Sequence, residues 1–222
     1  MKLTDLIIRG STFPIAIVSI IIDIYLLING VAIFGAAFAD YVPVIQIYLL
    51  LIVVLIPLSL YKNEFPILNL GISKTILLFI PAFFITWFAL SYESHVNILN
   101  STNPLTTIII TLLMEIFVVA FTEEMFFRGL LMGILEKYKI PYSYVWQGIL
   151  FGLFHYAAYS DLGSADFTSM LVAMVFGIAM GIIVYIGQTF YKTNYGIAVT
   201  WGIHAGWNVA LTIGLFAAGG LL

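Results

Sequence analysis

Residues 105–135 read LTTIIITLLMEIFVVAFTEEMFFRGLLMGIL, and this stretch is the most informative in the chain. A helix that crosses the hydrocarbon core of a bilayer needs about 20 mostly apolar residues. The stretch is longer than that, yet it contains Glu115, Glu123, Glu124 and Arg128. An ionisable side chain at membrane depth costs roughly 3 kcal/mol or more and marks a functional site by default. The stretch therefore predicts a membrane-spanning helix that carries chemistry.

The composition of the whole chain agrees with a lipid environment. Of 222 residues, 63% are hydrophobic and 9% are charged, and the mean hydropathy is +1.12. Soluble domains carry about 25% charged residues, so lipid must solvate the apolar excess. The net charge of -3 and the lack of a basic block exclude a nucleic-acid-binding surface. The absence of cysteine excludes thiolate metal sites, disulfides and a cysteine nucleophile.

Apolar stretches long enough to cross a bilayer recur along the chain, separated by short polar segments. We expect an all-α, polytopic bundle of about seven spans, in which residues 1–222 form a single transmembrane domain. The motif-bearing core is expected at about 105–210. The predicted spans are 12–38, 42–60, 73–92, 105–135, 142–158, 168–187 and 195–218.

The distribution of lysine and arginine predicts the orientation, because cytoplasmic loops carry an excess of these residues. Seven spans threaded from a cytoplasmic N-terminus put acids but no Lys or Arg in the outside loops. We therefore expect a multi-pass protein of the cell membrane with its N-terminus in the cytoplasm and its C-terminus outside. The basic residues that fall inside are Lys2, Arg9, Lys62, Lys74, Lys137, Lys139 and Lys192.

The first chemical motif is Glu-Glu-x-x-x-Arg at residues 123–128. Glu124 and Arg128 are four residues apart, so on an α-helix they share a face and can pair. Glu123 projects about 100° away, toward a different neighbour. One carboxylate is then neutralised while the other remains available as a general base. The alternative interpretation is a buried ion pair that only fixes helix packing.

Two further motifs contain histidine. Phe-x-x-x-His ends at His155 in the fifth span, and His-x-x-x-Asn joins His204 and Asn208 in the seventh. His204 and Asn208 share a helix face and can both donate hydrogen bonds toward one point. Taken alone, His155 is more often a packed histidine bonded to a backbone carbonyl, and the His204–Asn208 pair is as readily a polar clasp between helices.

The predicted depths favour a common site. Glu123 and His155 each lie about 20–25 Å from the turn near Lys137 to Lys139, counted at 1.5 Å per helical residue. His204 and Asn208 lie about 15–21 Å along the seventh span. Glu123, His155, His204 and Asn208 are thus expected at similar depth on three helices.

Together, the three motifs resemble those of the CPBP/Abi family of CAAX proteases and bacteriocin-processing proteins. The resemblance runs from about Glu123 to Asn208, and all three motifs are intact in their order. It implies an intramembrane endopeptidase whose substrate is a membrane-associated peptide or protein. The substrate classes that fit are prenylated C-termini, bacteriocin leaders and signalling peptides.

The resemblance also implies roles for residues. Glu123 and His155 would activate the attacking water. His204 and Asn208 would form the oxyanion hole, which agrees with their capacity as donors. Glu124 and Arg128 would order the site.

Two histidines and two glutamates are also possible zinc ligands. The sequence lacks the His-Glu-x-x-His spacing of the zincins, and a Glu124–Arg128 pair would withdraw one ligand. We expect a site without a metal or other cofactor, with zinc as the alternative.

Two other functions are weighed against the peptidase. One is a non-catalytic bacteriocin-immunity or regulatory membrane protein on the same fold, which would not need Glu123. The other is a transporter that uses the polar cluster as an ion site, although the sequence shows no paired broken helices in matching halves.

Residues outside the three motifs receive structural interpretations. Glu115 lies eight residues before Glu123, near the same face, and is interpreted as one side of a polar helix contact in preference to a cavity lining. Four glycine pairs have the small-x-x-x-small spacing of closely packed helices. They are Gly129/Gly133, Gly148/Gly152, Gly177/Gly181 and Gly202/Gly206.

The predicted orientation can be tested by labelling single cysteines, because the chain has none of its own. Cysteines at Ser94 and Ser164 should react with a membrane-impermeant thiol reagent added to intact cells. A cysteine at Lys139 should react only after permeabilisation. Labelling of position 139 from outside would overturn the topology.

Overall fold

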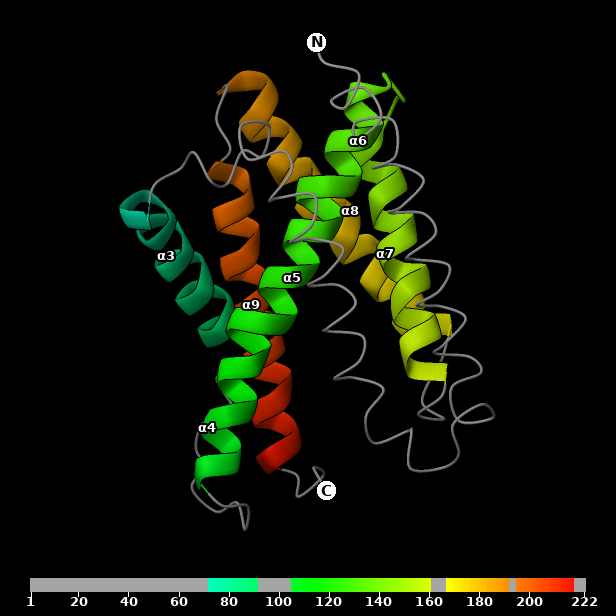
Figure 1. Cartoon of the computed structure of the whole chain (residues 1–222). Coiled ribbons are helices and arrows are strands. Elements are labelled where there is room, and N and C mark those ends of the chain that lie inside the picture. The colour runs from blue at the N-terminus through cyan, green and yellow to red at the C-terminus, as the bar shows by residue number, and fades with distance from the viewer. Residues whose placement is uncertain (1–71, 92–104, 161–166, 192–194, 218–222) are drawn as a thin grey trace, which may run out of the picture. The chain divides into compact units, whose positions relative to one another are not determined.

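A computed structural model describes residues 72–91, 105–160, 167–191 and 195–217, and in these ranges every regular element is helical (Figure 1). No strand occurs among the described residues. The predicted spans 12–38 and 42–60 lie outside them. The elements are α3 (Ile72–Ser91), α4 (Leu105–Met114), η4 (Glu115–Ala120), α5 (Phe121–Glu124), η5 (Met125–Leu131), α6 (Met132–Lys137), α7 (Ser143–Ser160), α8 (Phe167–Phe190) and α9 (Tyr195–Ala217).

The apolar stretches located the helices well. Each predicted span within the described ranges corresponds to a helical run whose ends lie within a few residues of the expected ones. Two described segments, Ser73–Leu90 and Phe167–Phe190, are long and apolar enough to cross a membrane by length and composition alone. Because the first two predicted spans lie outside the described residues, the number seven stays a prediction.

The run from 105 to 137 differs from the expected regular α-helix. Its segments η4 and η5 are π-helical, with hydrogen bonds from residue i to i+5. Neither segment contains proline, and η4 contains no glycine. Apolar periodicity predicts that a helix forms but is too coarse to distinguish these two hydrogen-bonding patterns.

The described helices divide into two compact units. The first unit contains described residues 125–160 and 167–185. The second contains 72–91, 105–124, 186–191 and 195–217, so it consists of stretches on both sides of the first unit in the sequence.

In the second unit, α3 and α9 run parallel and approach closely at two glycines of α9. A Cβ added to Gly202 would lie 2.5 Å from the backbone oxygen of Phe79, and one added to Gly206 would lie 2.6 Å from that of Phe83. The ring of Phe79 also packs against Trp201, with ring centroids 4.3 Å apart. The predicted close packing is therefore confirmed for this pair of glycines.

In the first unit, α7 and α8 are antiparallel and also meet at glycines. A Cβ added to Gly148 would lie 2.6 Å from the backbone nitrogen of Ile178, and one added to Gly152 would lie 2.8 Å from the backbone oxygen of Met170. Gly177 is equally close to α7, since its added Cβ would lie 3.0 Å from the Cα of Gly148. The prediction fails for Gly133, where an added Cβ would have no described atom within 4 Å.

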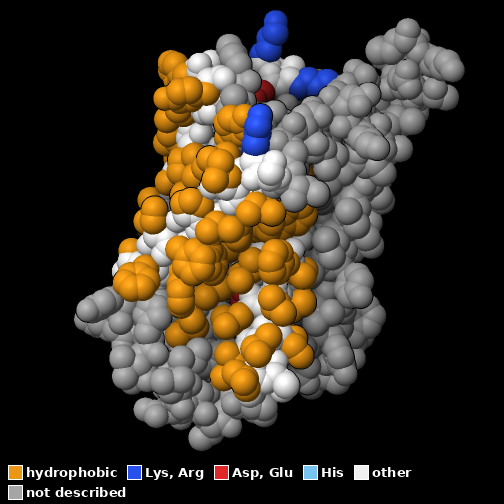
Figure 2. Space-filling view, turned by 90° about the vertical axis from the view of Figure 1, so that its left-hand side faces the viewer, with side chains coloured by type: hydrophobic (Ala, Val, Ile, Leu, Met, Phe, Trp, Pro, Cys, Tyr) orange, Lys and Arg blue, Asp and Glu red, His pale blue; other side chains and the backbone are white. Residues whose placement is uncertain are grey.

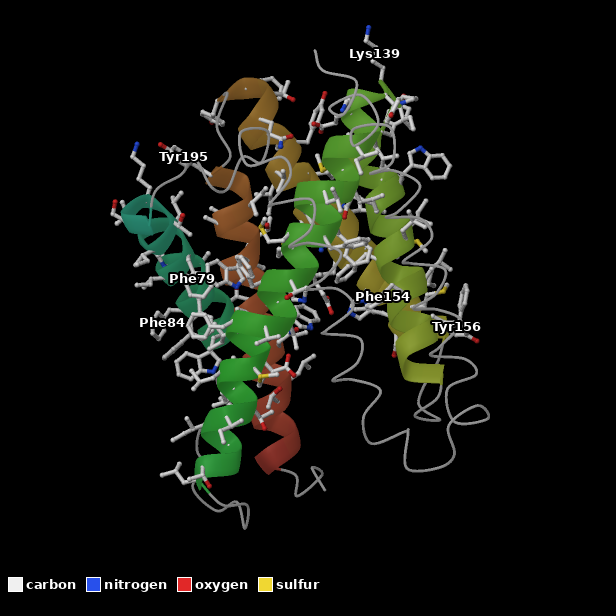
Figure 3. The ribbon with its side chains drawn as sticks, viewed as in Figure 1. Phe79, Phe84, Lys139, Phe154, Tyr156 and Tyr195 are labelled. Carbon is white, nitrogen blue, oxygen red and sulfur yellow. The ribbon has the colours of Figure 1, made fainter. Side chains whose placement is uncertain are left out.

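The turn between α6 and α7 is made without glycine. The amide of Ile140 donates to the carbonyl oxygen of Leu135 at 2.9 Å, as in the Schellman arrangement that closes many helices. Lys139 then has a φ of 56°, a left-handed conformation in which residues with a Cβ are strained. Its side chain projects away from the turn (Figure 3). Ser143 donates to Glu136 at 3.3 Å across this turn, and partial burial raises the pKa of Glu136 above its ordinary value.

The outward side of α3 is strongly apolar. Leu77, Ile85 and Phe88 are each more than half exposed, and Phe84 points away from α9 (Figure 3). Figure 2 shows one face of the described residues, on which hydrophobic side chains cover most of the surface and acidic side chains are almost hidden. Water would disfavour an apolar surface of this extent, whereas lipid solvates it.

The packing of α3 against α9 gives a matched pair of stability predictions. Gly202→Ala should destabilise the protein by about 1–3 kcal/mol, since the new methyl group would press on the backbone of α3. Gly214→Ala places the same methyl group on the same helix where no described atom lies within 4 Å. It should be neutral or stabilising by up to about 1 kcal/mol, because alanine favours helix over glycine. Thermal unfolding in detergent measures both, and equal effects would contradict the close contact.

Candidate active site

The second unit brings both glutamates of the first motif to one histidine of the third. His204 Nδ1 lies 2.9 Å from Glu124 Oε1, and His204 Nε2 lies 3.5 Å from Glu123 Oε2. All three side chains are buried. A buried charge is tolerated only with partners, so this cluster is a specific feature of the packing between α5 and α9.

This geometry corrects one detail of the sequence prediction. Glu123 was expected to face a different neighbour from Glu124, since adjacent helical residues project about 100° apart. Both carboxylates instead reach the same imidazole. The reason is that the ring presents its two nitrogens on different sides, so one histidine can span two neighbouring side chains.

The contact with Glu124 orients the imidazole of His204. An ionised carboxylate only accepts hydrogen bonds, so Nδ1 carries the hydrogen when Glu124 is ionised. The neutral ring then presents Nε2 as an acceptor toward Glu123, and the doubly protonated ring presents it as a donor. The cluster can therefore hold or pass a proton at Nε2.

Asn208 lies one helical turn beyond His204 and also contacts the 105–124 run. Its Nδ2 donates to Glu115 Oε2 at 3.0 Å. This hydrogen bond is the polar helix contact that the sequence analysis favoured for Glu115. Because His204 and Asn208 are four residues apart on α9, their contacts show that both lie on the face packed against 105–124.

Arg128 and His155 belong to the first unit, where both contact Phe151. The Arg128 guanidinium lies 4.3 Å from the centre of the Phe151 ring and donates to Gly177 O at 3.5 Å. His155 Nδ1 donates to the backbone oxygen of Phe151 at 2.9 Å. Phe151, the first residue of the Phe-x-x-x-His motif, thus packs against the arginine of the preceding motif.

The orientation of His155 is compatible with both interpretations of this residue. A hydrogen bond to a backbone carbonyl is what a merely packed histidine would make. A carbonyl oxygen only accepts, however, so Nδ1 carries the hydrogen and Nε2 of the neutral ring is the proton acceptor. That tautomer is also the one that a general base requires.

The pairing of Glu124 with Arg128 stays a prediction. It was argued from α-helical spacing, but the helix is π-helical from Met125 to Leu131. Within the described parts of the chain, no group of three or more His, Asp or Glu side chains has an arrangement suited to a metal ion.

Sequence reasoning missed two side chains that hold these helices. Trp201 donates from its indole nitrogen to Ile116 O at 2.8 Å. Gln147 donates to Gly177 O at 2.7 Å and is fully buried. The polarity of a buried glutamine within the span 142–158 was a usable signal, whereas a tryptophan in an apolar helix gives none.

A helical protein with an apolar exterior and buried ionisable clusters is of the class that carries a polar site within a membrane. Residues 105–210, a little under half of the chain, match the family model described as type II CAAX prenyl endopeptidase Rce1-like, and this segment is similar to that family of membrane-embedded endopeptidases. This match confirms the resemblance drawn from the motifs and assigns protease activity at the level of the family. No curated protein and no solved structure matches the chain.

Arg128 provides a test of the buried arginine contacts. Arg128→Ala should destabilise the protein by about 2–5 kcal/mol, because it removes a large, fully buried side chain together with its contacts with Phe151 and Gly177 O. Arg128→Lys should recover only part of this loss, because a point charge replaces a planar fork. Lys139→Ala is the matched control, since it removes a cation that is exposed. Unchanged thermal stability and abundance of Arg128→Ala in membranes would show that Arg128 has no structural role.

Proposed function

We propose that the protein is an intramembrane endopeptidase that hydrolyses a peptide bond in a membrane-associated peptide or protein. The observation that carries the proposal is the buried contact of Glu123 and Glu124 with His204 on α9, one turn from Asn208. These residues lie within the segment that matches the CAAX endopeptidase family. A carboxylate near two hydrogen-bond donors is what water-driven hydrolysis of an amide requires.

In the proposed reaction, Glu123 accepts a proton from a water molecule, and the water oxygen attacks the scissile carbonyl carbon. The carbonyl oxygen becomes an oxyanion, to which Nε2–H of the doubly protonated His204 ring and Nδ2–H of Asn208 donate. The carbon–nitrogen bond then breaks, and the proton held by Glu123 passes to the leaving amine. A carboxylic acid and an amine are released, so all atoms are accounted for. His155 enters this scheme through its motif alone, as a partner of Glu123 in activating the water.

Glu124 and Arg128 are assigned to ordering the site. The support for Glu124 is its 2.9 Å contact with His204 Nδ1, which orients the ring so that Nε2 is available for the oxyanion. For Arg128, the support is its complete burial against Phe151 and Gly177 O.

The proposed topology has seven spans, a cytoplasmic N-terminus and multiple passes through the cell membrane. Helix directions within each unit agree with consecutive spans that alternate in direction. α9 runs parallel to α3 and antiparallel to the 105–124 run, and α7 runs antiparallel to α8. The proposed orientation rests on the distribution of lysine and arginine.

The proposed reaction uses no metal, and zinc is the alternative. The choice rests on the donor set. Glu124 is engaged with His204, and the zincin spacing of two histidines around a glutamate is absent from the sequence.

Glu123→Gln is the decisive variant, because it preserves the shape of the side chain and removes the base. Cleavage of a farnesylated CAAX peptide by the purified protein should fall to background, with thermal stability retained. Asn208→Ala should lower the rate by about 10²–10³-fold, the usual effect of deleting one oxyanion donor. His204→Ala should lower it at least as far.

Glu136→Gln is the matched control, since it makes the same change at the turn and should leave the rate unchanged. A strong chelator should also leave the wild-type rate unchanged, whereas the zinc alternative requires loss with chelator and recovery with zinc. Comparing the membrane peptidomes of cells with wild-type and Glu123→Gln protein would identify the natural substrate. Normal cleavage by a folded Glu123→Gln protein would refute the peptidase and leave the immunity or regulatory function.

A further inference from the structure

Glu115 is an intramembrane acid that the proposed reaction does not use. It lies eight residues before Glu123, outside the three motifs. Its carboxylate accepts a hydrogen bond from Asn208 Nδ2 at 3.0 Å, and both side chains are partly buried. In the proposed reaction the Asn208 amide donates to the oxyanion. This same amide therefore also donates to the Glu115 carboxylate.

The π-helical segment η4 explains how Glu115 reaches α9. On a regular α-helix, residues eight apart differ by about 80° around the axis. A π-helical turn contains about one more residue than an α-helical turn, which rotates the chain back by roughly 100°. With η4 between them, Glu115 and Glu123 face nearly the same direction, so that each meets a polar side chain of α9.

Contacts from α9 also hold η4 in place. The indole nitrogen of Trp201 donates to Ile116 O, and its ring lies edge-on to Phe121 with centroids 5.0 Å apart. η4 contains neither glycine nor proline, and the hydrogen bond from Trp201 ties it to α9.

The hydrogen bond restricts the orientation of the Asn208 amide. An –NH2 group has two hydrogens in one plane, and Glu115 accepts one of them. The second hydrogen then has a fixed direction. Without Glu115, the amide would rotate about its last side-chain bond and would present a donor to the oxyanion for only part of the time.

We propose that Glu115 is a positioning residue that holds the Asn208 amide in its donating orientation for peptide hydrolysis. This inference rests on the proposed function of Asn208 as an oxyanion donor. Because the oxyanion exists only in the transition state and intermediate, loss of Glu115 should lower kcat and leave KM unchanged.

Two substitutions of similar size separate positioning from general stability. Glu115→Gln keeps an acceptor oxygen for Asn208, whereas Glu115→Leu removes it, and both remove the ionisable group. With the farnesylated CAAX peptide as probe, Glu115→Leu should lower kcat by about 10- to 100-fold, less than deletion of the donor itself. Glu115→Gln should restore most of the wild-type kcat. Thr212→Val, one turn beyond Asn208 on α9, is the control for a lost buried polar group and should leave kcat unchanged.

A double-mutant cycle with Asn208→Ala completes the test. If Glu115 acts through Asn208, Glu115→Leu should have no further effect in the Asn208→Ala background. Three outcomes would each overturn the inference. Glu115→Leu could lower kcat equally with Asn208 and with Ala at position 208, it could leave kcat at the wild-type value, or Glu115→Gln and Glu115→Leu could lower kcat equally. Glu123→Gln is measured in the same assay: its inactivity keeps the proposed function standing whatever Glu115 does, and its full activity removes both proposals.

Discussion

The contact between His204 and two adjacent carboxylates is the constraint on which the rest of the second unit depends. Lipid and apolar side chains offer no hydrogen bonds, so buried carboxylates and imidazoles must find each other on neighbouring helices. The 2.9 Å contact of His204 with Glu124 and the 3.5 Å approach to Glu123 fix the register of α9 against the 105–124 run. Once that register is set, Asn208 necessarily meets the same run one turn further along.

Glycines make this register possible on the opposite side of α9. Gly202 and Gly206 alternate with His204 along the helix and allow α3 to approach to backbone contact. Without hydrophobic driving force between helices in lipid, such close packing is a main source of association. The α9 helix thus has one face of small residues for α3 and another of polar residues for the 105–124 run.

The π-helical segments connect helix geometry to chemistry. Such segments are rare and are often found at functional sites. η4 begins at Glu115, and η5 contains Arg128. In the second unit, η4 rotates Glu115 toward Asn208. In the first unit, Arg128 of η5 packs on the ring of Phe151. The backbone oxygen of the same phenylalanine accepts a hydrogen bond from His155. The phenylalanine of the second motif therefore has a physical role that its spacing alone does not reveal.

The helical architecture and the motif residues could be predicted from the sequence, because both depend on local properties. Runs of apolar residues require helices in lipid, and isolated Glu, His, Arg and Asn residues within those runs are too costly to be incidental. The sequence could not determine which of these side chains meet. Spacing predicted that Glu123 and Glu124 would have different neighbours, yet His204 contacts both. That contact follows from the tertiary structure, since the reach of one imidazole between two side chains depends on how α9 packs against α5.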